Sequence, residues 1–153
     1  MRAFVHIELH SKNGQVLATR DCSNSVMRGG ARLIADLFAG RGSPITHMGV
    51  GTSDTPESDA FATEALSNDA IGDEAPLAGL HRFPVAGRLR LRGTLPAPAA
   101  NGLVREAGLL ARDDANAVLY NRVTFAPIQK GGDHELTLFW EVSFPYGDLQ
   151  WLM

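Results

Sequence analysis

The sequence predicts a mainly β protein, an antiparallel β-sandwich or small barrel of about seven or eight strands with one packed α-helix. Three observations support this class. The last third of the chain contains three strand patterns in succession, joined by short polar or Gly/Pro links. The final pattern, residues 134–144, alternates apolar with mostly polar side chains, which is typical of a strand with one face on a core. Only one segment, residues 24–39, has the periodicity of a long helix.

The length and composition indicate one globular domain, residues 1–153. With 14 Lys and Arg against 17 Asp and Glu, a broad nucleic-acid-binding surface is not expected. No apolar run reaches the roughly 20 residues of a membrane span, and charges interrupt the N-terminal apolar stretch, so neither a membrane partner nor a signal peptide is expected. The single cysteine, Cys22, excludes an intrachain disulfide and cannot form a structural zinc site alone.

Residues 1–20 are predicted to form an N-terminal hairpin with Asn13 and Gly14 at its turn. The polar face of the first strand carries His6, Glu8 and His10, three possible metal ligands about 7 Å apart at each step. The simpler interpretation is the solvated side of an amphipathic hairpin, and no metal or other cofactor is expected. A metal-dependent enzyme built on these residues is the least favoured of the functions considered.

The helix over residues 24–39 is expected to begin at a cap formed by Asn24 or Ser25 and to stop at Gly40. Gly29 and Gly30 each weaken its first turn by roughly 1 kcal/mol relative to alanine. Their presence therefore indicates close packing on a sheet. A short buried strand over residues 45–50 should follow.

Residues 52–76 are a long, weakly patterned connection of the kind that is often functional or involved in assembly. A β meander is predicted over residues 80–144. One of its strands projects Arg88, Arg90 and Arg92 from a single face. These arginines suit an acidic partner subunit, a sulfated or phosphorylated glycan or a nucleic-acid end, but also a solvated face with cross-strand Glu partners.

The strands on either side of residue 114 contain Glu106 and Arg122. If the hairpin turns near Asp114, residues whose numbers sum to about 228 face each other, which places Glu106 opposite Arg122. We therefore predict a partly buried ion pair that sets the strand register. The tail, residues 145–153, is unusually apolar for a chain end, and its Tyr146 and Trp151 are expected to dock on another surface.

Several short blocks are similar to those of a known group of proteins. They are Glu106-Ala-Gly-Leu109, the strand that ends Arg122-Val-Thr-Phe-Ala-Pro-Ile-Gln-Lys130, the closing strand over 136–144, and upstream segments over 24–40, 45–52 and 59–64. This pattern resembles small tailed-phage virion proteins of the tail or tail fibre. The resemblance implies a non-enzymatic structural subunit at the tail, baseplate or fibre attachment of a virion, or of a phage-derived particle such as a contractile injection system. Such a subunit would be made in the bacterial cytoplasm, self-associate as a homo-oligomer and dock on neighbouring subunits.

The alternative function is a carbohydrate or cell-surface binding module, which would need an exposed aromatic platform. Tyr146 and Trp151 are among the few aromatic candidates for it. Residues 49–52 resemble part of a phosphate loop but lack the lysine of a Walker motif, so a tight turn after a strand is the better interpretation. Cys22 and Ser23 have no recognisable orienting groups, and no residue is identified as catalytic.

Overall fold

The computed structural model describes residues 2–23, 25–55, 74–83, 87–113 and 116–144. It contains one helix, α1 (Arg28–Phe38), and ten strands among these residues. The strands are β1 (Arg2–His10), β2 (Val16–Ser23), β3 (Ser25–Val26), β4 (His47–Gly51), β5 (Glu74–Phe83), β6 (Arg88–Leu95), β7 (Gly102–Arg112), β8 (Ala117–Leu119), β9 (Asn121–Lys130) and β10 (Glu135–Ser143). The predicted apolar tail and most of the predicted long connection, residues 52–76, lie outside the described residues. The prediction is wrong for residues 74–76, which begin β5 by pairing with β4.

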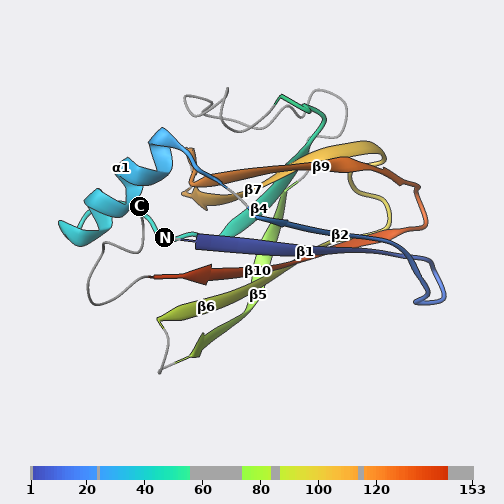
Figure 1. Cartoon of the computed structure of the whole chain (residues 1–153), viewed down its shortest axis with the longest axis horizontal. Coiled ribbons are helices and arrows are strands. Elements are labelled where there is room, and N and C mark those ends of the chain that lie inside the picture. The colour runs from blue at the N-terminus through green and yellow to red at the C-terminus, as the bar shows by residue number, and fades with distance from the viewer. Residues whose placement is uncertain (1, 24, 56–73, 84–86, 114–115, 145–153) are drawn as a thin grey trace.

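The strands form two antiparallel layers that pack face to face, with α1 at one end (Figure 1). The first sheet has the order β2-β1-β10-β6-β5, and the second has the order β5-β4-β7-β9, with β8 beside β7 and β3 beside β9. The predicted class, a mainly β sandwich with one packed helix, is confirmed. The eight longer strands agree with the predicted number of about seven or eight. β3 falls within the predicted helix, and β8 and β9 divide at Tyr120 a stretch that the sequence predicted as one strand.

Two strands pass from one layer to the other and so almost close the sheet on itself. The start of β5 pairs with β4, and the rest of β5 pairs with β6. At the opposite corner, β2 pairs with β1, whereas β3, which follows directly in sequence, pairs with β9. Few strand edges therefore remain open, which protects the protein against edge-to-edge association.

Arg20 spans the seam that remains between β2 and β9. Its side chain donates from Nε to the Ala126 carbonyl and from Nη2 to the Pro127 carbonyl, each at 2.9 Å. Pro127 itself has no backbone N–H to leave unpaired, as suits a residue on a strand edge. The seam between the two layers is thus closed by a side chain and not by a backbone ladder.

The predicted meander over residues 80–144 is wrong at two steps, because β6 pairs with β5 and β10 and not with β7, and because β10 does not pair with β9. β7 and β9 do form a hairpin, but β10 pairs with β1 and β6 in the first sheet. A tight turn, in which the His134 N–H donates to the Gly131 carbonyl at 3.2 Å, carries the chain from one layer to the other. The alternation in residues 134–144 specifies which side chains face the core, and that requirement is met equally well in either sheet.

The core lies between the layers and contains the inward side chains of both sheets. Val5, Ile7 and Leu9 of β1 are buried, as are Leu136, Leu138, Trp140 and Val142 of β10. They pack with Met48, Val104, Leu109 and Val123 from the second sheet. The predicted inward faces of the first and last strands are therefore confirmed.

The part of the chain that the structure describes contains no helix with the length and apolar character to cross a membrane.

Helix α1 begins later than the sequence predicted. Met27 occupies the N-cap position without a side-chain cap, because Ser25 and Val26 are extended and pair with β9. The predicted stop is confirmed. Gly40 has a φ of 75°, and the N–H groups of Gly40 and Arg41 donate to the carbonyls of Leu37 and Asp36 in a Schellman arrangement.

The close packing that the paired glycines indicated is present at one of them. A Cβ on Gly30 would overlap the backbone carbonyl of Tyr120, whereas a Cβ on Gly29 would make an ordinary contact, 3.5 Å from the Leu119 carbonyl oxygen. The backbone of Tyr120 is itself held in place, since its carbonyl accepts the Met27 N–H at 3.0 Å and its N–H donates to Leu109. The first turn of α1 therefore rests directly on the strand backbone.

The two glycines should respond in opposite ways to alanine. Gly30→Ala should lower the free energy of unfolding by about 1–3 kcal/mol, because the helix must move away from Tyr120. Gly29→Ala should leave stability unchanged or raise it by up to about 1 kcal/mol through helix propensity. Urea unfolding of both variants and the wild type measures the difference, and equal stabilisation by both substitutions would contradict this packing.

Candidate functional site

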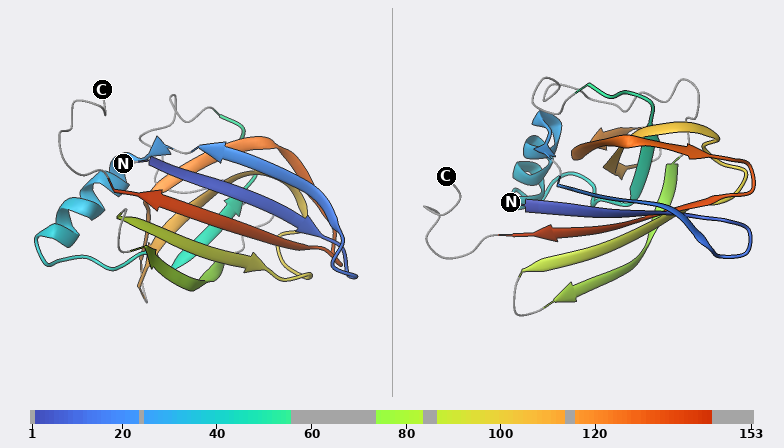
Figure 2. Two further views of the ribbon diagram at one scale, coloured as in Figure 1. Left: turned by 60° about the horizontal axis from the view of Figure 1, so that its bottom comes forward. Right: turned by 45° about the vertical axis from the view of Figure 1, so that its right-hand side comes forward.

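The outer face of the first sheet, whose strands β2, β1, β10 and β6 lie side by side in the left view of Figure 2, carries two neighbouring cross-strand rows of side chains. One row consists of Ser23, Phe4, Glu141 and Arg90, on β2, β1, β10 and β6 in turn. The next row along the same strands consists of Asp21, His6, Phe139 and Arg92. Strict alternation places all eight side chains on the face opposite the core.

These rows line a hollow of about 750 Å³, which we call the aromatic hollow. Its outward side chains are Phe4, His6, Asp21, Ser23, Arg90, Arg92, Phe139 and Glu141. Phe4 is 53% exposed and Phe139 is 39% exposed. Much of the apolar surface of these two rings therefore remains in contact with water. The imidazole of His6 lies beside Phe139, with ring centroids 6.1 Å apart. Two exposed aromatic rings in a polar rim are typical of an interaction site.

The predicted arginine face is present, and its members differ in their partners. Arg90 donates from Nε to Glu141 Oε2 at 3.0 Å, and Arg88 Nη1 lies 3.6 Å from Glu141 Oε1. For these two arginines the cross-strand Glu expected of a solvated face is found. Arg92 stands opposite Phe139 and forms no ion pair among the residues that the structure describes. The β6 side of the hollow therefore carries more positive than negative charge.

His6, Glu8 and His10 lie together on the outer face of β1, but their side chains bond to one another. Glu8 accepts from His6 Nε2 at 3.2 Å and from His10 Nε2 at 3.0 Å, and Asp21 accepts from His6 Nδ1 at 2.7 Å. Within the described ranges, no group of three or more His, Cys, Asp or Glu side chains converges to hold a metal ion. The i, i+2 spacing places the three side chains on one face of β1, as predicted. Hydrogen bonds between them account for their positions without a metal ion.

The electrostatics of this cluster favour the charged forms of its members. The hydrogen bond to Asp21 raises the pKa of His6 above its ordinary value, against a smaller opposing effect of burial, and Glu8 adds to the increase. The hydrogen bonds from His10 and then His6 lower the pKa of Glu8. The cluster is therefore most stabilising where Glu8 is ionised and His6 is protonated.

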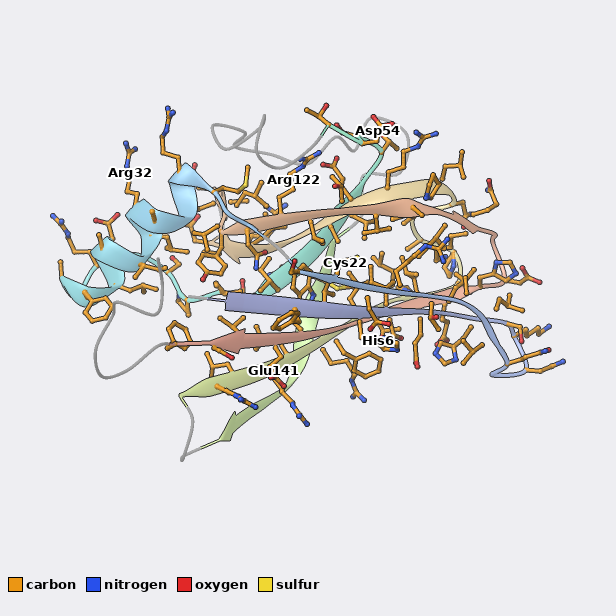
Figure 3. The ribbon with its side chains drawn as sticks, viewed as in Figure 1. His6, Cys22, Arg32, Asp54, Arg122 and Glu141 are labelled. Carbon is orange, nitrogen blue, oxygen red and sulfur yellow. The ribbon has the colours of Figure 1, made fainter. Side chains whose placement is uncertain are left out.

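Glu106 and Arg122 form the predicted ion pair, and it is more deeply buried than expected. Arg122 donates from Nε to Glu106 Oε2 at 2.6 Å, and each side chain is 1% exposed. Arg122 also donates to the Thr55 carbonyl at 2.7 Å and to Ser53 Oγ at 3.3 Å, while Glu106 Oε1 accepts the Ser53 N–H at 3.3 Å. The pair therefore holds residues 53–55, which follow β4, against the outer side of the second sheet, where Arg122 and Asp54 are labelled in Figure 3.

The predicted direct opposition of these two residues is wrong. Glu106 faces Thr124, because Leu110 pairs with Leu119 where the prediction required Val118, and the register moves by one more residue between β8 and β9. The further shift between Val104 and Glu106 lies beyond this pair as seen from the turn and does not affect it. Arg122 consequently reaches Glu106 along a diagonal on the same face of the sheet.

Sequence reasoning did not single out two buried polar residues of the second sheet, nor Phe139 of the hollow. Asn121 is fully buried, and its Oδ1 accepts the Leu109 N–H at 2.8 Å, in place of a backbone carbonyl, at the break between β8 and β9. Lys130 is 1% exposed and donates from Nζ to the Ala97 carbonyl at 3.0 Å. Phe139 could have been found, since it is the one aromatic residue on the otherwise polar face of residues 134–144. Tyr146 and Trp151 lie outside the described residues.

Comparisons with known proteins add no assignment. The chain matches no protein-family model, no curated protein and no solved structure. The function is therefore inferred from the residues and their geometry.

Glu106→Gln should destabilise the protein by about 3 kcal/mol, since it leaves the Arg122 charge buried without its counter-ion. Glu141→Gln is the matched control, because its partners Arg88 and Arg90 are more than half exposed and such pairs contribute at most about 1 kcal/mol. Chemical denaturation of both variants compares the two sites. Unchanged stability in Glu106→Gln would show that the buried pair does not hold the fold.

The His6 cluster should make stability depend on pH. Because the folded pKa of His6 is raised, its contribution is complete below its ordinary value of 6.5 and is lost as pH rises through the folded pKa. Because the pKa of Glu8 is lowered, its contribution is complete above its ordinary value of 4.5 and is lost as pH falls. Both contributions are present together between these two values.

Urea unfolding of the wild type and His6→Gln at pH 5.5, 7 and 8.5 tests this dependence. The gap in stability should be largest at pH 5.5, where it should stay below about 1 kcal/mol because these side chains are partly exposed. The gap should then shrink toward pH 8.5. In an Asp21→Asn background the gap should be smaller and flatter, whereas a gap that does not vary with pH in the wild-type background would refute the assignment.

Proposed function

We propose that this protein is a non-enzymatic structural subunit of a tailed-phage virion or of a phage-derived particle, placed at the tail, baseplate or fibre attachment. It acts by self-association and by docking on neighbouring subunits. The observation that carries this proposal is the aromatic hollow, in which Phe4 and Phe139 stay exposed on a regular sheet face. Exposed rings of this kind gain free energy when a partner covers them.

The closure of the fold supports docking through a face. With β2 joined to β9 through Arg20, and with β5 shared by both layers, a partner has little backbone edge on which to add a strand. The outer face of the second sheet is covered in part by Met27, which packs on Leu110 and Leu119, and by residues 53–55, which bond to Arg122. The first sheet presents the more accessible face.

The resemblance to phage tail proteins supports the kind of assembly. Its blocks include Glu106 and Arg122, which form the buried pair, and the strand over 136–144, which becomes β10. These blocks contribute to the stability of the sandwich, while Phe139 within β10 belongs to the hollow. A particle subunit needs both properties, a rigid body and an exposed contact face.

A second candidate function, recognition of an acidic cell-surface glycan, is favoured by one specific observation. Phe4 and Phe139 provide an exposed aromatic platform, and Arg92 beside it could bind a carboxylate or sulfate group. The platform stands on β1 and β10, while the tail residues expected from the sequence, Tyr146 and Trp151, lie outside the described residues.

Sedimentation of the native protein from cells that produce it tests the proposed function. We expect recovery in a particle of megadalton size, together with sheath, tube or capsid proteins that mass spectrometry identifies. Recovery only as a small species would contradict the structural role. A glycan array probed with the wild type and with Phe139→Ser would then test the second candidate.

A further inference from the structure

Charge is distributed very unevenly along this chain. Between Arg41 and Arg82 the sequence contains no Lys or Arg. Within that interval, residues 56–73 contain five of the chain's 17 acidic residues together with several apolar side chains, and we call them the acidic segment. Its acidic residues are Glu57, Asp59, Glu64, Asp69 and Asp73, and its larger apolar residues are Phe61, Leu66 and Ile71.

The aromatic hollow has the complementary character. Arg90 donates to the carboxylate of Glu141 at 3.0 Å, and Arg92 forms no ion pair within the described part of the chain. Asp21, the other carboxylate of the hollow, is bonded to His6 at 2.7 Å. The hollow thus places the guanidinium of Arg92 beside the exposed rings of Phe4 and Phe139, which suits a ligand that carries a carboxylate and apolar groups together.

The two ends of the acidic segment are both fixed at the second sheet. Before it, the Thr55 carbonyl accepts from Arg122 at 2.7 Å on the outer side of that sheet. After it, Glu74 begins β5 in register with Gly49 of β4. The hollow lies on the outer face of the first sheet, on the opposite side of the sandwich, as the positions of Arg122 and Asp54 relative to His6 and Glu141 show in Figure 3. This separation favours the hollow of another copy over that of the same chain.

We propose that copies of this chain associate head to tail, with the acidic segment of one copy bound in the aromatic hollow of the next. Arg92 is the residue that binds a carboxylate of the segment, and Phe4 and Phe139 contact its apolar side chains. The inference rests on the proposed function, because it specifies the self-association of the subunit. Since the two contacting surfaces differ, the interface is heterologous and generates a ring or an open fibre.

Charge complementarity of this kind makes association sensitive to salt. At about 0.15 M ionic strength the Debye length is about 8 Å, so exposed charges act mainly at contact distance, and at about 1 M it falls to about 3 Å. Association should therefore be strongest in dilute salt. Apolar contacts with the two rings respond much less to salt, so some association should persist.

A charge exchange in the full-length chain tests the proposal by sedimentation velocity. The Arg92→Glu protein should self-associate at least about tenfold more weakly than the wild type. The double variant Asp59→Lys with Glu64→Lys should show a similar loss. A mixture of the two variant proteins should associate again. In that mixture the acidic hollow of one variant meets the basic segment of the other, and the two unaltered surfaces also match.

Arg32→Glu is the matched control, since Arg32 is exposed on α1 away from the hollow (Figure 3). It changes the net charge as much as Arg92→Glu does and should leave association unchanged. Circular dichroism checks that each variant is folded, and Phe139→Ser gives a second, uncharged perturbation of the hollow. Arg92→Gln replaces Arg92→Glu if the latter does not fold.

The proposal would be overturned if the wild type were monomeric both at about 0.1 mM and after 100-fold dilution. It would also be overturned if the Arg92→Glu protein associated as strongly as the wild type. Binding of an acidic glycan to a monomeric wild type, with loss of that binding in Arg92→Glu, would assign the hollow to the glycan instead. These outcomes are independent of the particle test. A protein found in particles whose purified Arg92→Glu variant still associates would refute only the head-to-tail contact.

Discussion

Closure of the sheet is the constraint on which the rest of this structure depends. Two strand segments change layers, β5 at one corner and β2 with β3 at the other, so that a single hydrogen-bonded path runs almost completely around the core. Arg20 completes the path where the backbones of β2 and β9 do not pair. The core of both layers is thereby enclosed, and the outward side chains of the strands become the main surface available to partners.

The two outer faces use charged residues in different ways. On the second sheet, Glu106 and Arg122 are desolvated, and their remaining hydrogen-bonding capacity is directed to residues 53 and 55. Such a pair is costly to break and so holds one arrangement of the segment after β4. On the first sheet the charged side chains are exposed, and their pairing is incomplete at Arg92. The buried pair of the second sheet thus stabilises the fold, whereas the exposed charges of the first sheet are accessible to a partner.

The aromatic hollow combines features that a structural role alone does not require. On a sheet face that only meets water, threonine at the positions of Phe4 and Phe139 would suit the strand and leave no aromatic ring exposed. The His6 cluster beside them adds a group whose charge changes in a physiological pH range. An interface built on this face would therefore respond to both salt and pH.

The sequence by itself determined the class of fold and the faces of its strands. Alternation assigned the inward residues of β1 and β10 and the outward arginines of β6, because the side chains of a strand point in opposite directions in turn. The paired glycines correctly indicated that α1 packs closely, and the pair of Glu106 with Arg122 was found through their position on one hairpin.

Only the tertiary structure decided which strands are neighbours. The pattern of residues 134–144 satisfies either sheet, so it could not show that β10 lies between β1 and β6. The change of register between β8 and β9 and the extended Ser25 that shortens α1 also depend on backbone pairing that the side-chain pattern does not encode. The aromatic hollow arises from that strand order. Phe4, Phe139 and Arg92 are far apart along the chain, and they meet because hydrogen bonding between β1, β10 and β6 places them in adjacent rows.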